Sequence, residues 1–240
     1  MRIRRILVLC AALAVAGTLA AGCQSGSDTS PTAASAKTPP SAAALLHTSS
    51  ASMRGVTSVQ FNLTIAGNLP AVPIHSANGS LNAAGQAKGN ADLSEFGQLV
   101  EVEFVLTGDT FYLKGPTGGY QKLSATDAKS LFDPTAILDP NRGVANVLAH
   151  IQNPRSEGTA SVNGTTTDKI TGKVDGSVVD PIVPGVTGDV TATLWLATDA
   201  KALPVKAEFT VPAVVSNSSA TVDVTLSNYN QPVSVSAPTG

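Results

Sequence analysis

The side chains capable of catalysis are few in this sequence and poorly placed for it. His47, His75 and His150 are far apart along the chain, and none has the H-E-x-x-H spacing of a zinc site. Glu101 and Glu103 could form an acid–base pair, but they alternate with apolar residues and so belong on the solvent face of a strand. There is no G-x-S-x-G nucleophile elbow, P-loop or dinucleotide-binding glycine motif. The sequence therefore predicts no catalytic residue, no metal site and no cofactor, and indicates that the protein is not an enzyme.

The chemistry that the sequence does indicate is lipidation of Cys23. Three arginines within the first five residues precede an apolar stretch from Ile6 to Ala21, which is too short to span a membrane. Small residues follow and end at Cys23, as in a bacterial lipobox, where the cysteine thiol is acylated and the chain is cleaved before it. Ala20 stands where Leu or Val is commoner in a lipobox.

Cysteine and charge counts agree with an acyl anchor in the plasma membrane. Cys10 is removed with the signal, so the mature chain keeps Cys23 alone and can form neither an internal disulfide nor a thiolate metal cluster. The signal also removes three of the 15 basic residues and none of the 17 acidic ones. The mildly acidic body has no basic patch for nucleic acid or anionic headgroups, so we expect no nucleic-acid partner and attachment through acyl chains.

Three segments follow from this composition. Residues 1–22 are the predicted signal peptide, and residues 23–41 are a lipidated, flexible tether of Ser, Thr, Ala, Gly and Pro. Residues 42–240 are the predicted folded domain. The expected location is the outer face of the plasma membrane.

The folded domain is dominated by strands in which apolar and polar residues alternate. Val59, Phe61, Leu63 and Ile65 alternate with polar residues, as in a strand with one face in the core. Turn residues separate such runs, which predicts a meandering antiparallel sheet of about ten strands. The other runs are at residues 91–93, 100–106, 111–113, 170–174, 190–196, 205–211 and 222–226.

Helices are expected at the start and in the middle of the domain, which makes it an α+β fold. Ser41 is a candidate cap for a helix over Ala42–Met53. A short helix is predicted over Ser124–Phe132. A third, over Asn141–Gln152, carries an apolar stripe at helical spacing. The sheet's apolar face would curl over these helices.

The core is short of large side chains. The chain is 42% hydrophobic but only 4% aromatic, and small residues occupy inward positions at Ala91, Gly172, Ala192 and Ala207. Because close-packed interiors leave few voids, the missing volume is either lost by collapse or occupied by a ligand. Composition leaves both an apolar cavity and a plain Val/Ala-rich core open. The lone Trp195 is out of phase with the apolar run around it, which puts it either on the outer face or under another element, as a docking residue or a covered packing residue.

These segments resemble the LppX/LprA/LprF/LprG family of mycobacterial and actinobacterial lipoproteins. The resemblance covers the lipobox, the tether and about residues 45–238. Tyr229 stands where the family usually has Trp. The motifs are FDP and ILDPNRGVANVL at residues 132–148, DKITGKV at 168–174, TLWL at 193–196 and VTLSNY at 224–229.

The resemblance implies a single antiparallel half-barrel sheet wrapped over a few helices and enclosing an apolar lipid cavity. It further implies that the protein binds the acyl chains of envelope lipids, of the glycolipid, triacylglycerol or wax class, and carries them outward, with a membrane lipid exporter as a further partner. The expected cavity residues are Phe61, Leu63, Ala91, Leu93, Val102, Phe104, Val144, Val147 and Leu148.

Two other functions remain open from sequence. One is a surface-displayed interaction module with a filled core, acting as a scaffold for an envelope transporter. The other is a lipid hydrolase or transferase, for which no nucleophile–base pair is evident.

Overall fold

The computed structural model describes residues 40–67, 69, 73–95, 97–124, 126, 133–212 and 219–239. The predicted signal peptide, Cys23 and nearly all of the tether lie outside these residues, as does most of the helix expected over Ser124–Phe132. Within the described residues, no helix is both long and apolar enough to span a bilayer.

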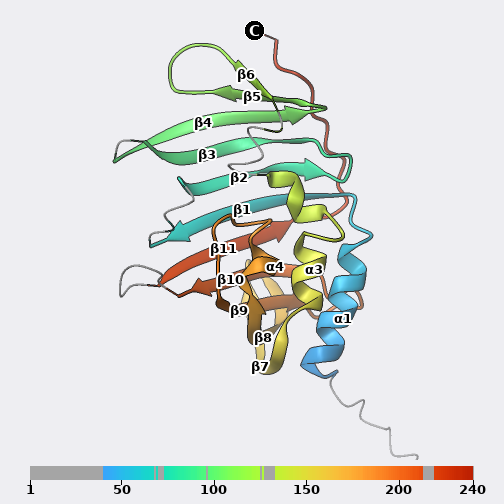
Figure 1. Cartoon of the computed structure of the whole chain (residues 1–240). Helices are drawn as coiled ribbons and strands as arrows, with labels where there is room; N and C mark the ends of the chain where they lie inside the picture. The colour runs from blue at the N-terminus through green and yellow to red at the C-terminus, as the bar shows by residue number, and fades with distance from the viewer. Residues whose placement is uncertain are drawn as a thin grey trace, which may run out of the picture. The chain divides into compact units, whose positions relative to one another are not determined.

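Among the described residues, eleven antiparallel strands form a single sheet in the order β6-β5-β4-β3-β2-β1-β11-β10-β9-β8-β7 (Figure 1). Two meanders, β1 to β6 and β7 to β11, are joined where β1 pairs with β11. The strands are β1 (Ser58–Ala66), β2 (Ile74–Asn82), β3 (Ala87–Glu95), β4 (Gln98–Thr107), β5 (Thr110–Lys114), β6 (Gln121–Ser124), β7 (Gln152–Val162), β8 (Thr165–Asp175), β9 (Asp189–Ala197), β10 (Pro204–Val211) and β11 (Ala220–Ser227).

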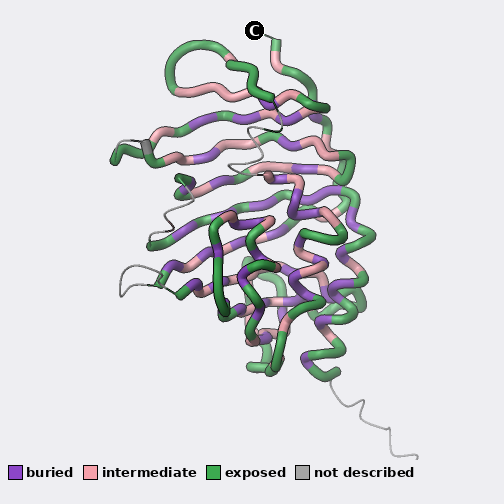
Figure 2. The backbone as a smooth tube through the Cα atoms, viewed as in Figure 1, coloured by how far each residue is buried: buried purple, intermediate pink, exposed green. Residues whose placement is uncertain are grey.

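Strand register separates the sheet into an apolar and a polar face. Phe61 lies opposite Leu226 on one side and Gly79 on the other. Residues directly opposite each other point to the same face, so the alternation seen in β1 continues into its neighbours. Buried and exposed residues accordingly alternate along most strands in Figure 2. The face that carries the helices is called the inner face below, and the opposite one the outer face.

The helices all lie on the inner face (Figure 1). α1 spans Ala42–Met53, and the Ser41 side chain accepts a hydrogen bond from the Ala44 N–H, which confirms the predicted cap. Ser50 Oγ on α1 donates to the Ala145 carbonyl of α3 at 2.7 Å. The other helical elements are the 3-10 helix η1 (Pro134–Leu138), α3 (Val144–Ala149) and α4 (Gly176–Val179).

The central helix is shorter than the predicted Asn141–Gln152. Asp139 Oδ1 accepts hydrogen bonds from the backbone N–H groups of Asn141 and Arg142, which holds these residues in a turn before the helix. The helix ends at Ala149, and its C-cap is His150, whose Nδ1 is 2.8 Å from the Asn146 carbonyl oxygen, as expected of a helix-end residue.

Two glycines allow β2 and β3 to approach closely. Gly79 and Gly89 are register partners, and both belong to the inner face. A Cβ on Gly79 would overlap the Lys88 carbonyl oxygen, and one on Gly89 would overlap that of Asn78. The close approach of these strands therefore requires glycine at both positions.

Candidate functional site

The six strand residues expected to line a cavity lie together on the inner face of β1, β3 and β4. Register aligns Leu63 with Ala77 of β2, Ala77 with Ala91, and Ala91 with Val102, so these four residues form one row across the sheet. The adjacent row runs from Phe61 through Gly79 and Gly89 to Phe104. Leu93 lies on the same face, two residues beyond Ala91, and is half-buried.

Small residues on β2 and β3 occupy neighbouring positions in the middle of this apolar face. Larger residues flank them on both sides, with Phe61 and Leu63 on β1 and Val102 and Phe104 on β4. These inward positions of β1 to β4 are therefore apolar, and none of the residues named here carries a charge. The small residues, called the small-residue lane below, are Ala77, Gly79, Ala87, Gly89 and Ala91.

The three helical residues of the expected site lie in the helical layer over the inner face, not on the sheet itself (Figure 1). Val147 and Leu148 are buried in α3 and Val144 is half-buried, and α3 packs against α1, η1 and α4. Leu148 also borders a groove between α1 and the start of β7. The structure therefore brings the six strand residues into one surface and puts the α3 residues in a neighbouring helical layer.

The helical element that packs on β2 is η1, which the sequence reasoning did not assign to the site. Its Ala136 and Ile137 are buried to 0% and 1% exposure. Asp133 starts this turn, since its side chain accepts from the Thr135 N–H at 3.1 Å. The sequence feature that could have predicted η1 is an apolar Ile-Leu pair between two Asp-Pro dipeptides.

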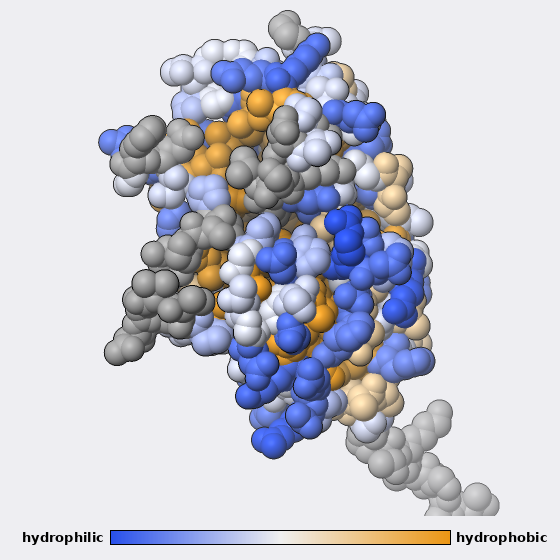
Figure 3. Space-filling view, viewed as in Figure 1, coloured by the Kyte–Doolittle hydropathy of each residue, from blue (hydrophilic) through white to orange (hydrophobic). Residues whose placement is uncertain are grey.

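Burial of the inner face decreases toward β6. Inner-face residues of β8, β9 and β11 such as Ile170, Leu196 and Val222 are completely buried. In contrast, Val100 and Leu113 are half-buried and Leu123 on β6 is 41% exposed. Figure 3 shows hydrophobic residues gathered over these upper strands. Among the described residues, exposure of the apolar face is thus confined to a few residues near β6, whereas Phe104 and Phe111 beside them stay buried.

One of the small inward residues does not mark free space. A Cβ added to Gly172 on β8 would lie only 2.5 Å from Ile151 Cγ2, so Ile151 fills the volume that the missing side chain leaves. Ala192, its register partner on β9, is completely buried. At Gly172, of the two alternatives left open by composition, the structure therefore shows a filled core, because Ile151, which follows α3, packs there.

The candidate acid–base residues are far from this face. Glu101 and Glu103 are on the outer face and exposed, as their alternation predicts. A hydrogen bond from the Tyr120 hydroxyl, followed by the Lys114 ammonium, lowers the pKa of Glu103 below its usual value. Among the described residues there is no group of three or more His, Cys, Asp or Glu that could hold a metal ion.

Comparison with known proteins identifies the family. The model of the LppX_LprAFG lipoproteins matches residues 41–235, which is most of the chain. The chain belongs to this family. LprF of Mycobacterium tuberculosis H37Rv, named as a diacylated glycolipid transporter, is 34% identical over 95% of this chain and 91% of its own. The lipoarabinomannan carrier protein LprG of Mycolicibacterium smegmatis is 33% identical over 96% of this chain and 94% of its own.

Solved structures of LppX_LprAFG proteins have the same fold. The crystal structure of LprF from Mycobacterium bovis superposes with a TM-score of 0.72 at 31% identity, covering 83% of this chain and 97% of the other. LppX from Mycobacterium tuberculosis gives a TM-score of 0.63 at 25% identity, covering 83% and 100%. The expected sheet wrapped over helices is therefore confirmed.

Tyr229 lies in the segment that follows β11. Its hydroxyl donates to the Pro204 carbonyl oxygen at 2.5 Å, and burial raises the pKa of the phenol. The segment after β11 is thereby fastened to the start of β10.

Proposed function

We propose that this protein is a non-enzymatic lipid carrier that binds acyl chains of an envelope glycolipid against the inner face of its sheet. The observation that carries the proposal is the small-residue lane, a set of small apolar residues next to half-buried inner-face residues of β4 and β5. The names of LprF and LprG, a glycolipid transporter and a lipoarabinomannan carrier, support the same class of ligand.

The energetics of such a site suit a shuttle. Exposing one methylene to water costs about 0.8 kcal/mol, so moving a 16-carbon chain through water costs about 13 kcal/mol. A surface as apolar as the bilayer removes most of this difference and makes loading reversible. Selection between lipids then depends on the volume above the small-residue lane and on polar groups around it.

The proposed binding surface comprises the six strand residues Phe61, Leu63, Ala91, Leu93, Val102 and Phe104. The α3 residues Val144, Val147 and Leu148 complete it as part of the helical layer over the sheet. Ile137 of η1 joins this layer, because η1 packs directly on β2.

Acylation of Cys23 would anchor the carrier to the outer face of the plasma membrane, after removal of residues 1–22. Two or three acyl chains bind firmly, whereas one chain binds weakly. Residues 23–41 would then be the tether and residues 42–240 the lipid-binding domain. As a flexible coil, a tether of this length spans about 20–25 Å, so the domain can reach the bilayer to load and release lipid, and can meet a membrane exporter.

Native mass spectrometry of the protein purified from its own host tests the proposal. We expect a population with the added mass of one diacyl or triacyl lipid, which organic extraction removes. Protein that carries no lipid and takes up no diacyl or triacyl ligand would contradict the carrier function.

A further inference from the structure

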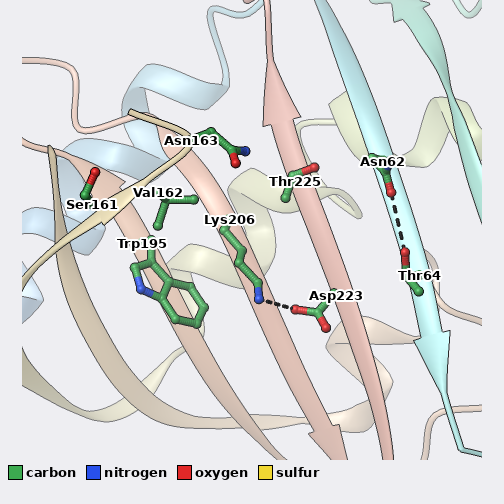
Figure 4. Close-up of a pocket in the computed structure, with 9 residues that line it drawn as sticks. All are labelled: Asn62, Thr64, Ser161, Val162, Asn163, Trp195, Lys206, Asp223 and Thr225. Carbon is green, nitrogen blue, oxygen red and sulfur yellow. Dashed lines mark hydrogen bonds and ion pairs between the residues drawn. The ribbon is translucent and has the colours of Figure 1, made fainter. Parts of the chain in front are cut away.

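The outer face of the sheet carries a polar groove around Trp195, the single tryptophan of the chain (Figure 4). The groove has a volume of about 520 Å³, within the range of small-molecule sites. Outward residues of β9, β10, β11 and β1 form its floor, and the end of β7 with the following turn forms a wall. The lining residues are Asn62, Thr64, Ser161, Val162, Asn163, Trp195, Lys206, Asp223 and Thr225.

Register fixes Trp195 on this face between two lysines. Lys169 on β8 and Lys206 on β10 are its direct partners, and all three side chains point outward. The two ammonium groups lie 5.4 Å and 5.0 Å from the centre of the ring. Lys206 Nζ is also 2.6 Å from Asp223 Oδ1. These contacts orient the indole, which remains half-buried and therefore partly accessible from the groove.

The lining chemistry matches an uncharged, hydroxyl-rich ligand. Five of the nine lining residues are neutral and polar, and the lining cation, Lys206, is paired with the lining anion, Asp223. Lys206 also lies 3.6 Å from Glu208 beside the groove, whose negative charge balances the positive charge of Lys169. A groove with no net charge does not favour a phosphate or a carboxylate. Amide side chains donate and accept hydrogen bonds, as sugar hydroxyls require, and the C–H face of a sugar ring packs on an aromatic ring.

We propose that this groove binds a neutral saccharide chain against Trp195, on the face opposite the lipid-binding surface. The saccharide could belong to the headgroup of a glycolipid or to a cell-wall polysaccharide. Both sources present the same chemistry. The site does not depend on the lipid-carrier function, because its residues are on the outer face and those of the small-residue lane are on the inner face.

Trp195 fluorescence tests the site directly, because the full chain in detergent contains one tryptophan only. The probes are oligosaccharides released from the host's insoluble cell wall, de-acylated glycans from its extractable glycolipids, and mannose 6-phosphate as an anionic comparison. We expect a saturable change in Trp195 emission with at least one neutral probe and none with mannose 6-phosphate. The neutral probe that binds more tightly identifies the source of the ligand.

Substitutions show whether Trp195 contacts a ligand or only packs against its neighbours. By calorimetry, Trp195→Leu should weaken binding of the neutral probe about tenfold, and Asn62→Ala, at an exposed groove position on β1, should weaken it severalfold. Tyr112→Leu is the matched control, since Tyr112 is an outer-face aromatic with Lys122 Nζ 5.8 Å from its ring but lies outside the groove. This variant should bind normally.

Three results would overturn the proposal. One is the absence of saturable binding by either neutral probe to the wild-type chain. A second is stronger binding of mannose 6-phosphate than of the neutral probes. The third is unchanged saccharide affinity in Asn62→Ala together with Trp195→Leu, with both variants folded by circular dichroism. Ala91→Trp, which alters the inner face, should leave saccharide binding intact even if lipid binding is lost.

Discussion

Replacing Ala91 with Trp distinguishes an open lipid site from a filled core. Ala91 is 6% exposed and lies in the small-residue lane between Ala77 and Val102. In a filled core the larger side chain would cost about 1–3 kcal/mol. Since 1 kcal/mol shifts the melting temperature of a domain of this size by about 2–4 °C, that cost predicts a decrease of roughly 2–12 °C. In an open site the indole is accommodated, and the melting temperature stays close to that of the wild type.

The same substitution should reduce lipid binding. If the indole displaces three methylene groups of the ligand, binding loses about 2.4 kcal/mol, or about fifty-fold in affinity. The assay is lipid occupancy by native mass spectrometry, combined with thermal unfolding of lipid-free protein. Ala192→Trp is the matched control, because Ala192 is an inner-face alanine with no exposed surface. It should destabilise the fold strongly.

Two outcomes would refute this reasoning. If Ala91→Trp destabilised the lipid-free protein as much as Ala192→Trp, the core around Ala91 would be filled and the interaction-module interpretation would be favoured. If Ala91→Trp folded normally and kept full lipid occupancy, lipid would bind elsewhere.

Three further predictions concern the fold and the anchor. Gly89→Ala should destabilise the domain by about 3 kcal/mol or more in chemical denaturation, because its Cβ overlaps the opposing backbone, whereas Gly119→Ala meets no atom within 4 Å and should be nearly neutral. Partial burial acts to raise the pKa of Asp139, but hydrogen bonds from backbone N–H groups and from Arg142 outweigh it and lower the pKa below 3.8. The ionised carboxylate therefore stabilises the fold, and this stability is lost as the pH falls below that value. Asp139→Asn should accordingly reduce the acid sensitivity of thermal unfolding. Cys23→Ser should move the protein out of the membrane fraction, as followed by immunoblotting after fractionation.

Each of these has a clear contrary result. Equal stability of the two glycine variants would show that β2 and β3 can separate at no cost. An unchanged acid sensitivity in Asp139→Asn would assign the loss of stability to other carboxylates. Membrane retention of Cys23→Ser would exclude acylation as the anchor.

Strong alternation and helix caps made much of the fold predictable from sequence. Ser41 located the start of α1, and the Val, Phe, Leu and Ile pattern of β1 identified its buried face. β2 was missed because its inward positions include Ala77 and Gly79, which give no alternation of bulky residues. β7 was missed because it is an exposed edge strand with register shifts, and it contains Pro154.

The pairing of strands and the packing of helices on the sheet could not be predicted from the alternation of apolar and polar residues. Alternation shows which residues of a strand share a face, so the grouping of Phe61 with Leu63, and of Val102 with Phe104, could be predicted. It does not show which strands pair, so the pairing of β1 with β11 came only from the structure. The position of η1 over β2 likewise depends on tertiary packing. Ala77 and Gly79, which prevented the prediction of β2 from sequence, are among the residues of the small-residue lane.

The measurement that tests the central claim most directly is the identity of lipid bound to the protein as isolated from its own host. Native mass spectrometry followed by tandem fragmentation should release a glycolipid with at least two acyl chains from the wild-type protein, at much lower occupancy in Ala91→Trp. Wild-type protein whose mass equals that of the acylated chain alone, and which remains so after incubation with diacyl and triacyl lipids, would contradict the account.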